Sequence, residues 1–348
     1  MKIRNKVWPI VAMGAVLAAS LTGCDSKPAP AASGGSASAS ASSAVAHPLP
    51  TDVPTACKPA KGGSNGKLLI GVVELSTQGS FFGQVDQGMQ DVATAAGVEI
   101  QIVDGKLDPQ VQSDAVDNLV TKGINVLLID AINSDALAPA VDRAVAAGIP
   151  VVTFDGPMND DKVSTFVGVS NSDGGKQIGD YFLKNVTSSG EIGEIGALNS
   201  SIQIERQKAF ENTVKAAGVK IGTVVDGQND ASKAQTAAEN LFTGSPDLKY
   251  VYATGLPALD GAVAAARSQN KTKQVQLVGW DLSANSAQGI KDGFVKAVLQ
   301  QDTFGEGQEA AKAGITLACG GSVGKTIPVP THIVTADNLD QYAYFLGN

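Results

Sequence analysis

From residue 67 onward the sequence alternates short apolar runs with longer amphipathic segments, and this alternation limits the possible folds more than any other feature. A short apolar run bounded by turn residues predicts a buried strand, and an amphipathic segment closed by glycine predicts a helix. The first set predicts strands at residues 68–73, 98–103, 124–130 and 149–154, with helices at 82–96, 109–122 and 134–147. Successive strand, helix, strand units predict a parallel sheet with helices on both faces.

After a turn-rich break at residues 156–162, a strand is predicted at 163–169 and a helix at 173–185. A second alternating set follows, with strands predicted at 191–198, 219–225, 250–254 and 274–279 and helices at 204–217, 231–243 and 258–268. Two successive sheets of this kind predict two similar lobes. The cleft between their carboxyl edges is suited to binding a ligand.

The amino terminus carries the features of an export signal. Basic residues at positions 2, 4 and 6 precede an apolar segment, residues 7–21, that is short for a membrane span. Leu21-Thr22-Gly23-Cys24 resembles the lipobox of bacterial lipoproteins, and an ordinary secretory cleavage site is the alternative. We expect residues 1–23 to be a lipoprotein signal peptide and Cys24 to carry a lipid anchor. The protein would then lie in the cell envelope, at the outer face of the cytoplasmic membrane, in the periplasmic space if the source is Gram-negative.

Residues 24–66 are predicted to form a disordered tether rich in Ala, Ser and Pro. Within it, residues 29–46 are almost entirely Ala, Ser, Gly and Pro. Such a segment buries too little apolar surface to offset the entropy cost of ordering the chain.

Charge and the rare residue types exclude several classes of function. The formal net charge is -8 and the chain has no cluster of Lys and Arg, which argues against a nucleic-acid surface. The two histidines, His47 and His332, lie in the tether and near the end, so we expect neither a histidine-based triad nor a metal site. Besides Cys24 the chain has Cys57 and Cys319. In an exported protein these two form a disulfide or remain as unpaired thiols.

The apolar run at residues 149–154 ends in Asp155 and Gly156. In a parallel α/β sheet, ligands bind at the carboxyl edge of the strands. Asp155 is therefore a candidate ligand contact, and the alternative is that it only caps a turn.

Several short stretches match a known family in the same order along most of the globular part. They are Gly71-Val72-Val73, Ser80-Phe81-Phe82, Gln87-Gly88-Met89, Ile129-Asp130 with Asn133-Ser134-Asp135-Ala136, residues 149–155, residues 167–171, Glu205-Arg206 and Val278-Gly279-Trp280-Asp281. On these stretches the chain from about residue 67 to residue 335 resembles the type I periplasmic binding proteins of sugar ABC transporters, the ribose-binding group in particular.

The resemblance implies an α/β fold of two similar, doubly wound parallel-sheet lobes joined by three crossings. The crossings would fall near Ser170, near residues 301–303 and near residues 328–330. Residues 67–169 plus 302–327 would form the N-terminal lobe, and residues 170–301 plus 328–348 the C-terminal lobe. Cys57 and Cys319 would then belong to the same lobe.

The resemblance also implies a set of ligand contacts. Asp155 and Asp281 match carboxylates on sugar hydroxyls, Arg206 a guanidinium and Gln301 a hinge amide. The aromatic side chains that would offer a stacking surface to the sugar are Phe81, Phe82 and Trp280. One of the two phenylalanines is expected to lie in the core instead. These assignments suit a sugar because charged partners form the stronger hydrogen bonds and rings cover its apolar faces.

The chain also departs from the ribose-binding pattern. Glycine replaces three polar contacts, at Gly79, Gly156 and about Gly255, and Asn229 replaces an aromatic residue. We expect a roomier pocket and a ligand other than ribose, such as a hexose, deoxysugar, disaccharide or polyol. Side chains that could compensate are Gln78, Glu74, Asn229 and Asp230.

The function implied by the resemblance is that of a monomeric solute-binding lipoprotein, without cofactors, that delivers a sugar to an ABC permease and its ATPase. The alternative is a sensor that presents a sugar or autoinducer-like molecule to a chemoreceptor or sensor kinase. An enzyme is not expected, because hydroxyl recognition explains Asp155 and Asp281 without glycosidase chemistry. A transcriptional regulator of this fold would carry a helix-turn-helix where this chain has its lipobox and tether.

Overall fold

A computed structural model describes residues 46–158 and 160–346. The predicted signal peptide, Cys24 and most of the predicted tether lie outside these residues. Within the described ranges, no helix is both long and apolar enough to span a membrane.

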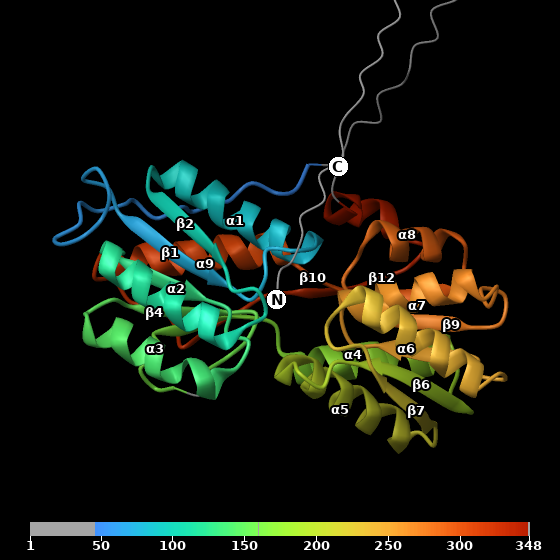
Figure 1. The fold of residues 1–348 in the computed structure, drawn as a ribbon. Coiled ribbons are helices and arrows are strands. Elements are labelled where there is room, and N and C mark those ends of the chain that lie inside the picture. The colour runs from blue at the N-terminus through green and yellow to red at the C-terminus, as the bar shows by residue number, and fades with distance from the viewer. Residues whose placement is uncertain (1–45, 159, 347–348) are drawn as a thin grey trace, which may run out of the picture. The chain divides into compact units, whose positions relative to one another are not determined.

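The first lobe is built on a six-stranded sheet whose strands are all parallel, in the order β11-β5-β4-β3-β1-β2. The strands are β1 (Leu69–Glu74), β2 (Glu99–Asp104), β3 (Val126–Ile129), β4 (Val151–Phe154), β5 (Thr165–Gly168) and β11 (Thr326–Pro328). Helices α1 (Ser80–Ala96) and α9 (Thr303–Ala318) cover one face, and α2 (Pro109–Lys122) and α3 (Ser134–Ala146) cover the other (Figure 1).

The second lobe repeats this design with the sheet order β12-β10-β9-β8-β6-β7, in which only the β10–β12 pair is antiparallel. The strands are β6 (Glu191–Gly196), β7 (Lys220–Asp226), β8 (Tyr250–Ala253), β9 (Gln276–Trp280), β10 (Val295–Gln301) and β12 (Thr331–Val334). One face packs on α4 (Asn171–Asn185) and α5 (Ser201–Ala216). The other packs on α6 (Ala231–Gly244), α7 (Leu256–Ser268), α8 (Ala284–Lys291) and the 3-10 helix η1 (Leu339–Leu346).

Local capping sets where the helices begin and end. The Asp108 side chain accepts hydrogen bonds from the first backbone N–H groups of α2, and Gly123 ends that helix in the left-handed conformation. Helix α5 begins at Ser201, three residues before the predicted start, because the Ser200 side chain caps it. This early start adds a turn of helix that faces the second lobe's sheet edge.

Two glycines bring α1 and α9 unusually close together. A Cβ atom on Gly88 would lie 2.1 Å from the carbonyl oxygen of Phe304, and one on Gly307 would lie 2.0 Å from that of Val85. Only glycine permits this contact between helix backbones. The contact fixes α9 in the first lobe, although its sequence follows a strand of the second.

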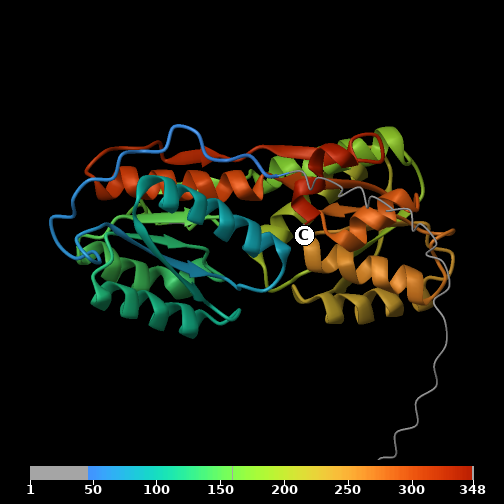
Figure 2. The same cartoon turned by 90° about the horizontal axis from the view of Figure 1, so that it is seen from above.

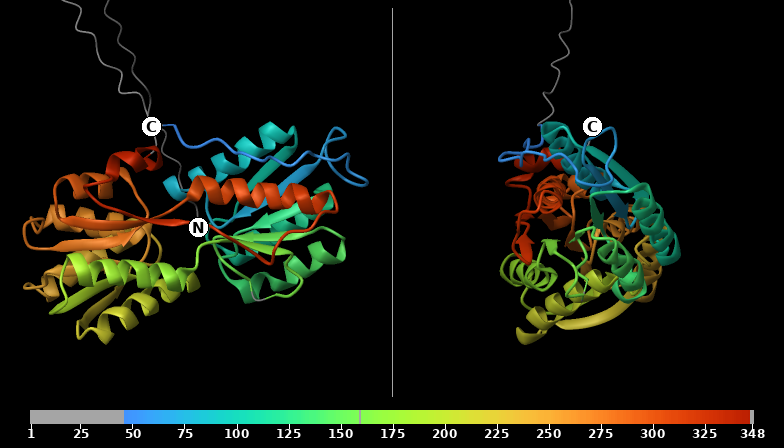
Figure 3. Two further views of the ribbon diagram at one scale, coloured as in Figure 1. Left: turned by 180° about the vertical axis from the view of Figure 1, so that it is seen from behind. Right: turned by 90° about the vertical axis from the view of Figure 1, so that its left-hand side faces the viewer.

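The chain passes between the lobes three times: from β5 to α4, from β10 to α9 and from β11 to β12 (Figure 3). The crossings are hydrogen-bonded to one another. The Val329 N–H donates to the Gly168 carbonyl at 3.0 Å, and the Asp302 N–H donates to the Pro330 carbonyl at 3.1 Å. The predicted fold class, two α/β lobes joined by a three-crossing hinge, is confirmed.

Residues 46–66, which we call the leader segment, contain no regular element except an isolated bridge between Ser64 and Lys67. They run along the first lobe beside α9 (Figure 2). The His47 ring stacks on Phe304 with 4.2 Å between centroids, and Cys57 forms a disulfide with Cys319 at the end of α9. The expectation of a disordered tether therefore needs correction for residues 46–66, which are irregular but held against the lobe.

Candidate functional site

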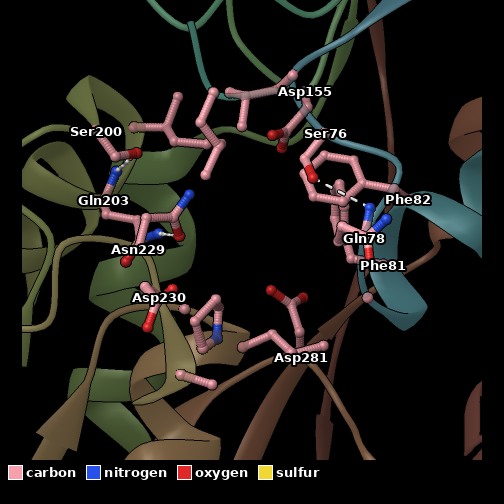
Figure 4. A pocket seen from close by; sticks show the side chains of 18 of the residues that line it. Ser76, Gln78, Phe81, Phe82, Asp155, Ser200, Gln203, Asn229, Asp230 and Asp281 are labelled. Atoms are coloured by element: carbon pink, nitrogen blue, oxygen red, sulfur yellow. Dashed lines mark hydrogen bonds between the residues drawn. The ribbon is translucent and has the colours of Figure 1, made fainter. Parts of the chain in front are cut away.

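A cavity of about 430 Å³ lies between the carboxyl edges of the two sheets (Figure 4). Loops that follow strands of both sheets supply its walls, as expected for parallel α/β sheets. The first lobe contributes Leu75, Ser76, Gln78, Gly79, Phe81, Phe82, Leu107 and Asp155. The remaining lining residues are Ser200, Ile202, Gln203, Arg206, Asn229, Asp230, Ala231, Gly255, Leu256, Pro257, Asp260, Asp281 and Gln301.

Two aspartates occupy corresponding positions in the two lobes. Asp155 follows β4 and Asp281 follows β9, each is 5% exposed, and both have positive φ, 53° and 62°. A non-glycine residue rarely adopts this conformation, and such strain is often found at functional sites. Figure 4 shows both carboxylates pointing into the cavity. Their placement supports the ligand-contact interpretation of Asp155.

Arg206 on α5 lies between these carboxylates and is 2% exposed. Its Nη2 is 3.9 Å from Asp155 Oδ1, and its Nη1 is 3.9 Å from Asp281 Oδ2. The guanidinium is held by other groups: Nε donates to Asn171 Oδ1 at 2.7 Å, and Nη2 donates to Gln301 Oε1 at 3.3 Å. Because its planar group is fixed, Arg206 presents its charge to both lobes at once.

Trp280 does not line the cavity, which corrects the expectation that it stacks on a ligand. The side chain is fully buried, its indole N–H donates to the Tyr252 hydroxyl at 2.9 Å, and its ring packs against Gly174. The Arg206 guanidinium carbon lies 3.9 Å from the ring centroid. Trp280 therefore stabilises the position of Arg206 by a cation–π contact with its ring face.

Phe81 and Phe82 both line the cavity, half-buried and in an edge-to-face arrangement with 5.2 Å between centroids. The expectation that one of them lies in the core holds only in part, because Phe81 packs against the core but lines the cavity as well. Both lie in the first turn of helix α1. Successive side chains point to opposite sides in a strand but not in a helix. Gln78 lies beside them, and its N–H donates to Ser76 Oγ at 3.0 Å.

On the second lobe, Asn229 lines the cavity together with a residue that the sequence analysis missed. The Gln203 Nε2 donates to Asn229 Oδ1 at 2.6 Å, and its Oε1 accepts from the Thr254 hydroxyl at 2.7 Å. Gln203 precedes Arg206 by three residues on α5, so the spacing of one helical turn could have identified it. Gly255 makes room for it, because a Cβ there would lie 2.9 Å from the Gln203 side chain.

The three glycines that were expected to enlarge the pocket play different roles. Gly79 lines the cavity and faces open space, whereas Gln203 fills the space at Gly255. Gly156 is outside this cavity and lies in a small adjoining pocket, where a Cβ would be 3.3 Å from Asp130 Oδ1. Only Gly79 therefore enlarges the cavity as expected.

Further carboxylates lie behind Asp155. The Asp155 N–H donates to Glu306 Oε1 at 2.6 Å, and Asp130 and Glu74 are fully buried nearby at the ends of β3 and β1. Glu74, expected as a compensating contact, is absent from the cavity lining. Burial raises the pKa of Asp130, Glu306 and Glu74 well above the usual range, and like charges raise it further.

Burial also raises the pKa of Asp155 and Asp281, against the effect of Arg206. The pKa of Asp155 is raised to about 6 by burial, which Arg206 partly offsets. The pKa of Asp281 is raised for the same reason, while Arg206 and the Gln301 Nε2, 2.9 Å away, lower it. Asp155 is therefore mainly ionised near neutral pH and can accept hydrogen bonds from hydroxyl groups.

The chemistry of the cavity suits a polyhydroxylated ligand. Carboxylates and a guanidinium can pair with hydroxyls, amides can donate and accept, and two rings offer apolar surface. In the described part of the chain, no group of three or more His, Cys, Asp or Glu side chains could hold a metal ion.

Residues 70–322 match the family described as "Periplasmic binding protein domain". The chain belongs to this family of periplasmic binding proteins. One relative of this binding protein is the ribose import binding protein RbsB of Bacillus subtilis (strain 168), 29% identical over 283 residues that cover 81% of this chain and 92% of RbsB. Another is the ABC transporter periplasmic-binding protein YphF of Escherichia coli (strain K12), 30% identical over 251 residues that cover 67% of this chain and 75% of YphF.

Solved structures share the fold of this periplasmic binding protein. An ABC transporter solute-binding protein from Mycobacterium smegmatis, with bound glycerol, superimposes with a TM-score of 0.74 at 29% identity, covering 79% of this chain and 96% of that one. One from Bacillus halodurans C-125, with bound myo-inositol, has a TM-score of 0.75 at 21% identity, covers 81% of this chain and 99% of that one, and bears on the fold alone. These relatives are binding proteins, which agrees with the expectation that the chain is not an enzyme.

Proposed function

We propose that this protein captures a sugar or sugar-like polyol in the cavity between its lobes and delivers it to an ABC importer. The observation that carries the proposal is the pairing of Asp155 from one lobe with Arg206 and Asp281 from the other across one cavity. One relative is a ribose import binding protein and another was solved with bound glycerol, which supports the same class of ligand.

The proposed mechanism is closure of the lobes about the three crossings. A ligand that bonds to Asp155 and Arg206 together contacts both lobes, so it binds the closed arrangement more tightly than the open one and shifts the population toward it. Phe81 and Phe82 would cover an apolar face of the ligand, while Gln78, Asn229 and Gln301 would bond to hydroxyls. The importer would recognise the closed form.

The proposed place of action is the cell envelope, with a lipid anchor at Cys24. Its test is the Cys24→Ala variant, which should lose its lipid-modified mass and leave the membrane fraction. Uptake of labelled ligand by cells lacking this protein separates transport from sensing. Unchanged uptake together with a lost chemotactic response to the ligand would favour the sensor.

A thermal-shift screen against neutral sugars and polyols tests ligand binding, because a ligand that binds only the folded state raises its melting temperature. For a ligand found in this way, calorimetry should show that Asp155→Asn and Arg206→Ala each weaken binding about 100-fold or more, since each leaves a buried partner unpaired. The control is Asp247→Asn, an exposed aspartate that follows α6 and is not among the cavity residues. Equal affinity in all variants would contradict the assigned site.

A further inference from the structure

The cavity is strongly unbalanced in charge. Asp155, Asp230, Asp260 and Asp281 all line it, and among its described lining residues Arg206 is the only cation. Asp155 and Asp281 are buried and Asp260 is half-buried, so solvent screens their charges less than it screens that of the exposed Asp230.

Arg206 cannot balance all four carboxylates or receive an anionic ligand freely. Its Nε and Nη2 already donate to Asn171 and Gln301. Its Nη2 and Nη1 also lie 3.9 Å from carboxylate oxygens of Asp155 and Asp281, respectively. An anion would have to compete with these two aspartates for the same guanidinium. Asp230 and Asp260 have no ion pair among those found in the described part of the chain.

The two remaining aspartates are held in place by hydrogen bonds rather than by ion pairs, Asp260 half-buried on α7 and Asp230 exposed as the cap of α6. Asp260 Oδ1 accepts from the Ser283 hydroxyl, and Asp230 Oδ1 accepts from the Lys233 N–H at 2.9 Å. The Lys233 ammonium instead donates to Gln228 at 2.9 Å. Among the described residues, neither carboxylate therefore has a cationic group within ion-pair distance.

Asp155 gives an independent indication that the missing partner is a ligand. Its Oδ1 is buried and has no hydrogen-bond partner in the structure, and Figure 4 shows the carboxylate aimed into the cavity. A buried carboxylate oxygen without a donor is unfavourable. A donor brought by the ligand would satisfy it.

We propose that the cavity selects a ligand carrying a positive charge as well as hydroxyls, an amino sugar or amino polyol, and that it rejects sugar acids and sugar phosphates. This inference rests on the proposed function and specifies its ligand class. The ligand ammonium lies among Asp230, Asp260 and Asp281 of the second lobe, while its hydroxyls bond to Asp155 and Arg206. Charge-assisted hydrogen bonds at that end give the selectivity, because they are stronger than those of a hydroxyl.

The test is calorimetry with compounds matched in shape and different in charge. The neutral panel of the screen is extended with amino and carboxylate analogues, such as glucose, glucosamine and glucuronate, and galactose, galactosamine and galacturonate. At least one amino compound should bind about tenfold or more tightly than its neutral counterpart, a difference of about 1.4 kcal/mol, with no detectable binding of the acids. Asp260→Asn and Asp230→Asn should each reduce this preference at least about threefold, by the loss of one charge-assisted contact.

The control variant Asp247→Asn removes the same charge from an exposed site and should keep the full preference. A neutral or acidic compound that binds as tightly as its amino analogue overturns the inference and leaves the proposed function standing. Preference unchanged in both cavity variants also overturns it. If no compound of any charge class binds, both the inference and the proposed function fail.

Discussion

Replacing Arg206 by methionine tests the electrostatics of the cavity most directly. Methionine approximates the length of the arginine stem but removes the charge between Asp155 and Asp281. At an effective dielectric constant of about 20, a pair of charges 3.9 Å apart interacts by about 4 kcal/mol, and Arg206 makes two such contacts. Part of this gain is offset by the cost of burying the guanidinium, so breaking the network should lower the free energy of unfolding by about 3–5 kcal/mol near neutral pH.

The loss should shrink as the pH falls. Arg206 lowers the pKa of Asp155 and Asp281 against the effect of burial, so its removal raises both pKa values further. For each additional proton that the folded variant binds relative to the folded wild type, the difference in the free energy of unfolding shrinks by about 1.4 kcal/mol per pH unit of acidification. The variant should therefore approach the wild-type stability as its buried carboxylates become neutral.

Urea unfolding followed by far-ultraviolet circular dichroism at several pH values measures this difference without relying on Trp280 fluorescence, which contact with Arg206 would perturb. The matched control is Arg267→Met. Its Nη2 lies 3.2 Å from Asp292 Oδ2, but the two side chains are 36% and 43% exposed, so a loss of at most about 1 kcal/mol with little pH dependence is expected. An Arg206→Met loss as small as the control, or one that grows on acidification, would refute the reasoning.

Three further predictions concern stability. Burial raises the pKa of Glu194 to about 8, so the wild type should lose stability as the pH rises from about 5 to about 8. In urea titrations Glu194→Gln should reduce that loss, whereas Glu205→Gln, at an exposed position, should not. Exchanging Cys57 and Cys319 for serine opens a link across a sequence separation of 262 and should cost about 2–4 kcal/mol in the same assay. Gly307→Ala should lower the melting temperature by forcing α1 and α9 apart, at a cost of about 1–3 kcal/mol.

The counterpart of the last variant is Gly83→Ala on α1. A Cβ at Gly83 would meet open space, so this substitution should stabilise the helix by about 0.5–1 kcal/mol. Stabilisation by both glycine substitutions would show that the close contact between α1 and α9 is not required. Full retention of stability without the disulfide would likewise show that the leader segment is held by its other contacts.

The central strands were predictable because their apolar runs are buried on both faces of the sheet, as the wholly buried residues of β1 illustrate. Helix starts were less predictable, since the start of α5 depends on the Ser200 side chain rather than on apolar spacing. Helix α8 and strands β10 and β12 were not predicted individually. Strand β12 pairs with β10 after the chain has crossed to the other lobe and back, which no local pattern reveals.

In the cavity, the aspartates at strand ends were predictable because parallel strands align their carboxyl ends at one sheet edge. The direction of Trp280 was not, because its ring occupies space left by Gly174, which is far away in the sequence. The contact of Asp155 with Glu306 joins residues 151 positions apart in the sequence. Asp260 reaches the cavity from the first turns of α7, which follows β8. Such contacts follow from tertiary packing alone.

The route by which the leader segment joins the first lobe has a mechanical consequence. His47 contacts the beginning of α9 and Cys57 is bonded to Cys319 at its end, so tension applied to the chain ahead of residue 46 reaches α9 before it reaches β1. Drag on the protein would thus be borne by covalent bonds and by a helix that starts at a lobe crossing. The first strand of the sheet, β1, is thereby shielded from that force.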